Sequence, residues 1–245
     1  LDAQNAAMRA LVDSPLSTPA PITTSSGGLR ETVSLAGTRH SVRLLSYVSG
    51  TPMTGHTYLA PSTARLFGAL AGQVSAALAD FDHLGCHQPT QWDLRHSDRV
   101  VADLLADVDP PLRERIRTLS QQAHRALGPV ADALPRQAVH GDITDFNVVS
   151  QFEAAGRPRP IGVIDFGDLM RSWLVADLAV TCASVLRHTP DDPFAVLPAV
   201  RAFDELVPLV RGVVRGGPGG EGALHVVGAG GRGHLVQVGP AGEGG

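Results

Sequence analysis

The chain has 245 residues, enough for one large domain or for two lobes around a sizeable hydrophobic core. A formal net charge of −4 at pH 7 gives no reason to expect nucleic acid or an anionic membrane surface as a partner. The two cysteines lie far apart, and no apolar run approaches the roughly 18 residues of a membrane-spanning helix, so we expect a cytoplasmic protein with reduced thiols.

The first part of the chain is expected to form one short helix and two strands. Residues 2–12 carry alanines and Leu11 on one side of a helical pattern. Residues 14–26 are rich in Pro, Ser and Thr and indicate a connecting loop. Strands are predicted over Glu31–Leu35 and residues 41–48, and the imperfect alternation of the second strand indicates burial on both faces.

Amphipathic helices are predicted to dominate the rest of the chain. The helical spacing of apolar residues predicts them over residues 61–81, 97–108, 110–134, 172–188 and 193–210. Ser62 or Thr63 is expected to cap the first of these helices with its hydroxyl group.

A polar stretch after the first long helix contains Trp92 beside Asp93. A tryptophan in a charged loop can form one wall of a substrate pocket. An ordinary packing role for Trp92 is the alternative that the sequence leaves open.

A β-hairpin is predicted near the middle of the chain. Val148 and Val149 begin its first strand, a polar turn with Gly156 follows, and residues 161–164 form its second strand. The loop before the first strand and the loop after the second strand then lie at the same end of the hairpin. We therefore expect three side chains from these loops to converge, those of Asp142, Asn147 and Asp165.

The converging side chains offer only oxygen ligands, which suit Mg²⁺, a hard cation that keeps several waters and shares phosphate oxygens. A carboxylate beside such a metal can orient a hydroxyl and take its proton as it attacks a phosphoryl group. His-Gly-Asp at residues 140–142, with Asn147 five residues after the Asp, and then Asp-Phe-Gly at residues 165–167 repeat the motifs of protein kinases. Each motif alone is ordinary turn chemistry, but both together and in order, beside apolar strands, indicate a kinase-like site.

With these motifs the chain resembles the aminoglycoside phosphotransferase family, the small-molecule branch of the protein-kinase-like fold, and within it the hydroxylysine-kinase-like group. The resemblance covers roughly residues 1–210, and the stretches that carry it are residues 1–7, 42–45, 50–52, 81–83, 92–94 and 164–168. It implies an α+β fold of two kinase-like lobes, with a truncated N-lobe and a mainly helical C-lobe. Residues 1–48 would be the remnant of the N-lobe, and residues 49–210 would be the C-lobe.

The resemblance also implies roles around the transferred phosphoryl group. Asp142 would be the catalytic base, while Asn147 and Asp165 would hold Mg²⁺ and with it ATP or GTP, the phosphoryl donor. His140 is expected to pack beneath the catalytic loop, and Asp177 is expected to brace this loop from the next helix. Both of the latter roles are structural.

The same resemblance indicates where the nucleotide base and the acceptor would bind. The linker after the small sheet would contact the base through the backbone of Ser46, Tyr47 and Val48. The acceptor would be a hydroxyl of a small amino-bearing molecule, similar to hydroxylysine or to an aminoglycoside. Because an amine favours an acidic pocket, the candidate substrate residues are Asp145, Asp168 and Asp93, with Trp92 as a wall.

One feature of the composition conflicts with an active kinase: the 20 Lys and Arg residues are all arginines, so the chain has no lysine. Kinase-like folds hold the α- and β-phosphates with a lysine on an N-lobe strand. We therefore expect the lysine strand and a glycine-rich loop to lie upstream of residue 1. The alternative hypotheses are a catalytically impaired, pseudokinase-like module, a fragment of a larger multidomain enzyme, and a Mg²⁺-dependent hydrolase.

The last part of the chain differs in composition from the rest. Of the 34 residues from Gly212 to the end, 14 are glycine, and the helical periodicity fades. Residues 228–233 fit the pattern Gly-x-Gly-x-x-Gly, but a dinucleotide site needs a following helix and an acidic residue about 20 positions on. We therefore expect residues 211–245 to be a disordered tail rather than a cofactor site.

Overall fold

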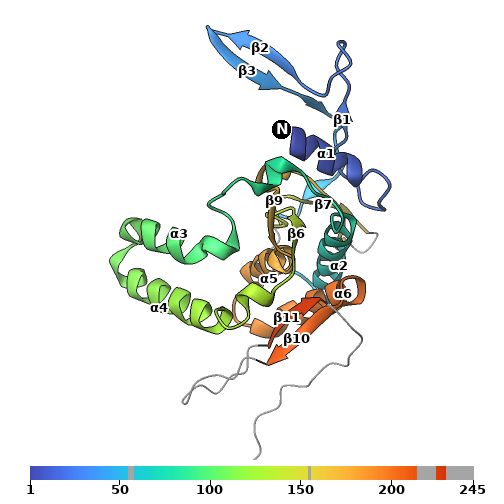
Figure 1. Cartoon of the computed structure of the whole chain (residues 1–245). Helices are drawn as coiled ribbons and strands as arrows, with labels where there is room; N and C mark the ends of the chain where they lie inside the picture. Colours follow the sequence, from blue (N-terminus) through green and yellow to red (C-terminus); the bar gives the residue numbers. More distant parts are fainter. Residues whose placement is uncertain (55–57, 154–155, 214–224, 230–245) are drawn as a thin grey trace, which may run out of the picture. The chain divides into compact units, whose positions relative to one another are not determined.

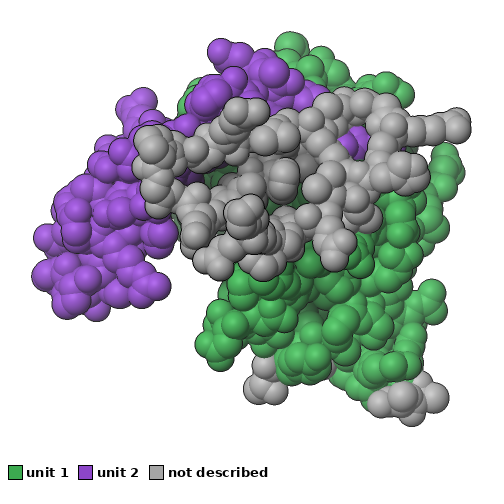
Figure 2. Space-filling view, turned by 90° about the horizontal axis from the view of Figure 1, so that it is seen from below, with its two compact units in different colours: residues 1–97, 136–207 green, residues 98–135, 208–245 purple. Residues whose placement is uncertain are grey.

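The computed structural model describes residues 1–54, 58–153, 156–213 and 225–229 (Figure 1). The chain divides into two compact units: residues 1–97 with 136–207, and residues 98–135 with 208–245 (Figure 2). The first 48 residues and the predicted hairpin belong to the same unit.

The first unit begins with helix α1 (Asp2–Ala10), close to the predicted helix. It buries Ala7, Met8 and the following Leu11 against the rest of the unit. The chain then reaches the hairpin predicted over residues 148–164, where the Ser17 N–H donates to the Ile161 carbonyl oxygen at 3.0 Å. Val163 returns the contact, because its N–H donates to the Ser17 carbonyl oxygen at 3.1 Å.

Two small antiparallel pairs follow α1. Strand β1 (Pro21–Ile22) pairs with β4 (Leu44–Leu45), and β2 (Glu31–Leu35) pairs with β3 (Thr38–Val42). The single strand that we predicted over residues 41–48 is therefore divided between β3, β4 and a linker.

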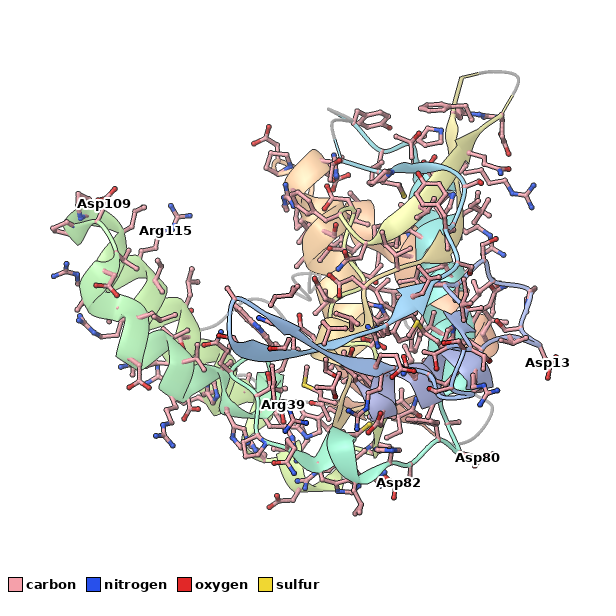
Figure 3. All side chains as sticks on the ribbon, turned by 90° about the horizontal axis from the view of Figure 1, so that it is seen from above. Asp13, Arg39, Asp80, Asp82, Asp109 and Arg115 are labelled. Atoms are coloured by element: carbon pink, nitrogen blue, oxygen red, sulfur yellow. The ribbon has the colours of Figure 1, made fainter. Side chains whose placement is uncertain are left out.

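The prediction that this strand is buried on both faces is wrong, because every residue of β3 is exposed. Ala36 and Gly37, with φ angles of 49° and 80°, form a tight turn, so β3 begins earlier than predicted, at Thr38. Polar side chains such as Arg39, labelled in Figure 3, occupy the hairpin formed by β2 and β3.

The helical core of this unit consists of α2 (Pro61–Ala77), α5 (Ala176–His188) and α6 (Leu197–Leu206). Leu70, Val74 and Leu78 are buried in this helix, whereas Leu66, one turn earlier, is 36% exposed. The predicted cap is wrong: no side chain caps α2, which begins with Pro61 after Ala60. The Thr63 hydroxyl instead donates to the Pro158 carbonyl oxygen at 3.3 Å.

Helix α2 lies close to α6 because a glycine faces it. A Cβ atom on Gly68 would lie 2.1 Å from the Ala199 carbonyl oxygen, and backbone atoms cannot move aside as a flexible side chain can. We expect Gly68→Ala to lower the free energy of unfolding by about 2 kcal/mol or more, although alanine favours the helix itself by about 1 kcal/mol. Urea denaturation measures the change. Gly28→Ala is the control, because the nearest non-neighbouring atom is 3.4 Å from that Cβ, and an equal effect of both would contradict this packing argument.

The predicted hairpin is confirmed and is longer than expected. Strand β7 (Val148–Phe152) pairs with β8 (Pro158–Val163), and β5 (Thr51–Pro52) adds an edge strand to β7. In the register, Val148 lies opposite Val163.

A second strand pair was not predicted: β6 (Arg136–Val139) and β9 (Met170–Trp173) are antiparallel, with Val139 opposite Met170. Because β9 takes up residues that we assigned to a helix, α5 begins at Ala176 rather than at residue 172. Short 3₁₀ turns complete the unit at Leu84–His87, Leu94–His96, Phe166–Asp168 and Pro193–Val196. The last predicted helix is therefore shorter than expected.

The second unit contains α4 (Pro110–Leu127) and all but the first residue of α3 (Ser97–Leu104). Two 3₁₀ turns, Leu105–Asp107 and Ala131–Ala133, follow them, so both helices end earlier than predicted. Asp109, labelled in Figure 3, lies in the turn between the two helices.

Part of the predicted disordered tail forms a strand pair in this second unit. Strand β10 (Leu209–Val213) pairs with β11 (His225–Ala229), in stretches rich in β-branched valine. Residues 214–224 and 230–245 lie outside the described residues, as does most of the Gly-x-Gly-x-x-Gly stretch. In the described part of the chain, no helix is both long enough and apolar enough to cross a membrane.

Candidate active site

Two loops meet at one end of the β7–β8 hairpin. The predicted catalytic loop, residues 140–147, connects β6 to β7, and the predicted metal loop, residues 164–168, follows β8. A hydrogen bond joins them, because the Ile164 N–H donates to the Asn147 carbonyl oxygen at 2.9 Å. The structure thereby brings Asp142, Asn147 and Asp165 to the same end of the hairpin.

Asp142 and Asn147 are in direct contact. The Asn147 Nδ2 group donates to Asp142 Oδ2 at 2.6 Å and to the Asp142 carbonyl oxygen at 3.1 Å. This orientation leaves the amide oxygen of Asn147 available on the other side of the group. Burial raises the pKa of the Asp142 carboxyl group, and the negative charges of Asp165 and Asp145 raise this pKa further, against the hydrogen bonds from Thr144 and Asn147.

Asp165 is held in an uncommon backbone conformation. Its φ of 63° lies in the left-handed region, which a short polar side chain tolerates by bonding to its own backbone neighbours. Here the Gly167 N–H donates to Asp165 Oδ1 at 3.0 Å, while the residue stays exposed. The two loops approach closely at Gly141, where a Cβ atom would lie 2.6 Å from the Asp168 carbonyl oxygen and the φ is +87°.

The first turn of α5 fastens the catalytic loop. Both oxygens of the fully buried Asp177 carboxylate accept backbone N–H groups, from His140 at 3.0 Å and from Gly141 at 2.8 Å. One turn later, the Thr181 hydroxyl donates to the Ile143 carbonyl oxygen at 3.2 Å. Through these contacts, α5 holds the backbone of residues 140, 141 and 143.

His140 is fully buried beneath the loop, and its contacts define its tautomer. Its Nε2 atom lies 3.2 Å from the Ile164 carbonyl oxygen, which can only accept, so Nε2 carries the proton. The unprotonated Nδ1 then accepts the Asp142 N–H at 3.3 Å. The ring packs against the edge of Phe166, with centroids 4.7 Å apart, and burial lowers the pKa of His140 to about 4.

The stability of the loop depends on pH through two opposing groups. Between pH 6.5 and about 4, unfolded His140 binds a proton that the native state excludes, so its contribution to stability falls on acidification. Burial raises the pKa of Asp177 from 3.8 to about 6, so in that interval the native state binds the extra proton and the contribution has the opposite sign. The two contributions therefore nearly cancel between pH 4 and 6.

Removal of one titrating group should reveal the other. In Asp177→Asn only the His140 contribution remains, and we expect the free energy of unfolding to fall by about 1.4 kcal/mol per pH unit more steeply than in the wild type between about pH 6 and 4. Denaturant unfolding at several pH values measures both slopes. Parallel slopes in the two proteins would contradict the assigned protonation states.

Asp145, which we predicted as a substrate residue, does not face open space. Its side chain is 1% exposed, and its carboxylate accepts from Ser184 Oγ at 2.9 Å and from Arg187 Nη1 at 3.0 Å. The other oxygen lies 3.0 Å from Nε2 of His188. The Asp145 N–H donates to the Ser184 hydroxyl as well, so we propose that Asp145 positions the loop and does not contact substrate.

Asp93 is likewise buried within the fold rather than open to an acceptor. It pairs with Arg95 Nη2 at 2.5 Å and accepts from the Ser172 hydroxyl at 2.6 Å. Its neighbour Trp92 is 54% exposed. The structure therefore leaves Trp92 accessible and gives Asp93 a role in holding β9.

Asp168 remains the most accessible of the predicted acidic substrate residues near the loops. It is half-buried and lines a cavity of about 350 Å³ together with Gln4, His83 and Thr90. Burial raises the pKa of its carboxyl group, and the charges of Asp142 and Asp165 raise it further, which is consistent with closely spaced carboxylates.

The predicted nucleotide linker lines a separate cavity of about 360 Å³. Tyr47, which is 85% exposed, and Val48 form part of this cavity, with Leu16 and Ile161. Ser46 fixes the start of the linker, because its N–H donates to the Ala20 carbonyl oxygen at 2.9 Å.

Apart from Asp177, the partners of the catalytic loop on α5 were not predicted from the sequence. Asp177, Thr181, Ser184 and His188 follow the spacing i, i+4, i+7 and i+11, which places polar side chains on one face of a helix. This polar stripe on an otherwise apolar helix was the available signal. The contact of Arg43 with α1, in which its Nη1 donates to Asn5 Oδ1 at 3.0 Å, was not predicted either.

Comparisons with known proteins identify the family of this chain. A model of the phosphotransferase enzyme family matches residues 1–205. The chain belongs to the phosphotransferase enzyme family. It is 24% identical over 225 residues to a hydroxylysine kinase of Xenopus laevis, and the match covers 85% of this chain and 59% of that protein.

Solved structures of small-molecule kinases show the same fold. A microcompartment-associated aminopropanol kinase is similar with a TM-score of 0.57 and 16% identity, covering 84% of this chain and 64% of its own. The amicoumacin kinase hAmiN, in complex with AMP-PNP and Ca²⁺, gives the same TM-score and identity, covering 83% of this chain and 61% of its own. The predicted α+β, kinase-like fold is therefore confirmed, and this member of the phosphotransferase enzyme family spans about 60% of the length of these relatives.

Proposed function

We propose that the chain transfers the γ-phosphoryl group of ATP or GTP to a hydroxyl of a small amino-bearing molecule, with Mg²⁺. The observation that carries this proposal is the contact of Asp142 with Asn147 in a loop that Asp177 fastens beside Asp165. The matched family and the kinases of similar fold support phosphoryl transfer as the reaction class.

In this proposal Asp142 acts on the acceptor. Its carboxylate orients the attacking hydroxyl and takes the hydroxyl proton as the bond to phosphorus forms. A pKa raised by burial makes this carboxylate a better proton acceptor than an exposed one. The contact from Asn147 Nδ2 holds it in a single orientation.

Asn147 and Asp165 would hold Mg²⁺, and the donor set fits this ion. Asn147 turns its Nδ2 group toward Asp142, which leaves an amide oxygen, and Asp165 contributes an exposed carboxylate. Among the described residues, no group of three or more His, Cys, Asp or Glu side chains could hold a metal alone. Such a small set suits Mg²⁺, which shares its ligands with phosphate oxygens and, when bound, neutralises charge on them.

Nucleotide binding tests this proposal directly. We expect calorimetric titration to detect binding of ATP or GTP that depends on Mg²⁺, and Asp165→Asn to weaken it at least about tenfold, since a charged ligand of the ion is lost. The control is Asp80→Asn, at an exposed residue labelled in Figure 3. Binding that is independent of Mg²⁺, or equal in both variants, would contradict the assigned metal residues.

A non-catalytic, pseudokinase-like module is the second candidate, favoured by the absence of lysine from the chain. In that case the loops would retain their geometry while the phosphates lack a cationic anchor. Binding of Mg²⁺ and nucleotide without transfer to any amino alcohol is the result that this candidate predicts.

A further inference from the structure

The catalytic loop presents one exposed aromatic ring beside its metal-binding amide. Phe146 directly precedes Asn147 and is 55% exposed. The guanidinium carbon of Arg187, from the last turn of α5, lies 4.9 Å from the centroid of this ring. The Arg187 side chain is itself 55% exposed, so a cation stacked on an aromatic face lies at the surface of the catalytic loop.

The guanidinium is held in place from its inner side. Arg187 Nη1 donates to Asp145 Oδ1 at 3.0 Å, and the Asp145 carboxylate is buried. A guanidinium has five N–H donors. Within the described part of the chain, the bond to Asp145 leaves most of these donors available for another acceptor. A fixed cation of this kind loses little conformational entropy when it binds a carboxylate.

The alternative is that Arg187 stabilises the fold and binds no ligand. An arginine at a helix C-terminus and beside a buried carboxylate stabilises both. Asp145, however, also has the Ser184 hydroxyl and His188, and the His188 side chain is only 6% exposed. His188 therefore satisfies Asp145 from inside the fold, while Arg187 approaches from the solvent side with Phe146.

The location of this pair points to the acceptor rather than the nucleotide. Phe146 directly precedes Asn147, whose Nδ2 group donates to Asp142 Oδ2 at 2.6 Å, and Arg187 binds Asp145 in the same loop. The predicted nucleotide linker, with Tyr47 and Val48, lines a cavity whose lining residues do not include Phe146 or Arg187.

We propose that Arg187 and Phe146 form a subsite that binds a carboxylate of the acceptor while the acceptor hydroxyl lies at Asp142. The inference rests on the proposed function and narrows its substrate class. The preferred acceptor is a hydroxylated amino acid with a free carboxylate. Aminoglycosides, which carry amines but no carboxylate, do not use this subsite.

The test compares hydroxylysine with its amide, which has nearly the same shape but no negative charge. We expect calorimetry to show that the wild-type chain binds hydroxylysine about tenfold more tightly than the amide, since one exposed charge-assisted contact is worth about this much. Arg187→Gln should bind the two molecules equally, and Arg187→Lys should keep part of the preference. Arg201→Gln, at an exposed arginine of α6, should keep all of it.

The ratio is measured within each variant, so a loss of stability in Arg187→Gln does not imitate the expected result. An unchanged preference in Arg187→Gln overturns the subsite. Equal binding of hydroxylysine and its amide by the wild type overturns it as well, but leaves the proposed function intact. Binding of neither molecule by the wild type counts against both.

Discussion

Asp142→Asn should lose phosphoryl transfer by about a thousandfold, within the range that a general base contributes to catalysis. An asparagine at this position can still accept the hydrogen bond from Asn147 Nδ2, which is 2.6 Å long in the wild type. The loop therefore keeps its conformation, and only the proton acceptor is removed. Single-turnover transfer from radiolabelled ATP or GTP measures the effect.

Nucleotide binding separates loss of the base from loss of the fold in this variant. We expect Asp142→Asn to bind Mg²⁺ and ADP with nearly unchanged affinity, because Asn147 and Asp165 remain. Asp192→Asn is a matched control, since Asp192 is exposed and only caps a 3₁₀ turn through the Phe194 N–H at 2.9 Å. Transfer by Asp142→Asn at the wild-type rate would remove Asp142 as the base.

Asp177→Asn should have the largest effect on stability among the site variants. The new amide oxygen can accept one of the two backbone N–H groups, but its amide nitrogen faces the other, which leaves a buried donor unsatisfied. We expect the free energy of unfolding at pH 7 to fall by about 2–4 kcal/mol, since the lost bond involved a charged group. Chemical denaturation measures this change.

Asp192→Asn is also the control for the stability of Asp177→Asn. Asp192→Asn also changes a carboxylate that accepts a backbone N–H, but water can replace that contact, so its effect should stay below about 1 kcal/mol. Transfer should also fall in Asp177→Asn, because His140 and Gly141 lead directly into Asp142. A variant as stable as the wild type would show that the catalytic loop does not depend on α5.

Patterns of neighbouring residues predicted the elements whose contacts are close in the sequence. The apolar stretches that became β7 and β8 lie on either side of a polar turn. The hairpin, and the meeting of the two loops at its end, therefore followed from the sequence. The four-residue strands β6 and β9 are too short to show a period, and Ser172 and Trp173 fitted a helical pattern equally well.

Contacts between distant residues could not be predicted from such patterns. Asp145 and Asp93 appeared as free acidic side chains, yet each accepts a hydrogen bond from a distant serine, Ser184 at 39 residues and Ser172 at 79 residues along the chain. A lone carboxylate gives no sign of whether a hydroxyl or a guanidinium will meet it in the fold. In the fold, both carboxylates instead accept hydrogen bonds from neighbouring elements.

The most direct test of the account is Mg²⁺-dependent phosphoryl transfer by this chain. Radiolabelled ATP and GTP would be incubated with a set of hydroxylated amino acids and amino alcohols, with and without Mg²⁺, beside Asp142→Asn. We expect labelled product only with Mg²⁺ and only with an intact Asp142. Tight Mg²⁺-dependent nucleotide binding without any labelled product would contradict a catalytic role and favour the pseudokinase-like module.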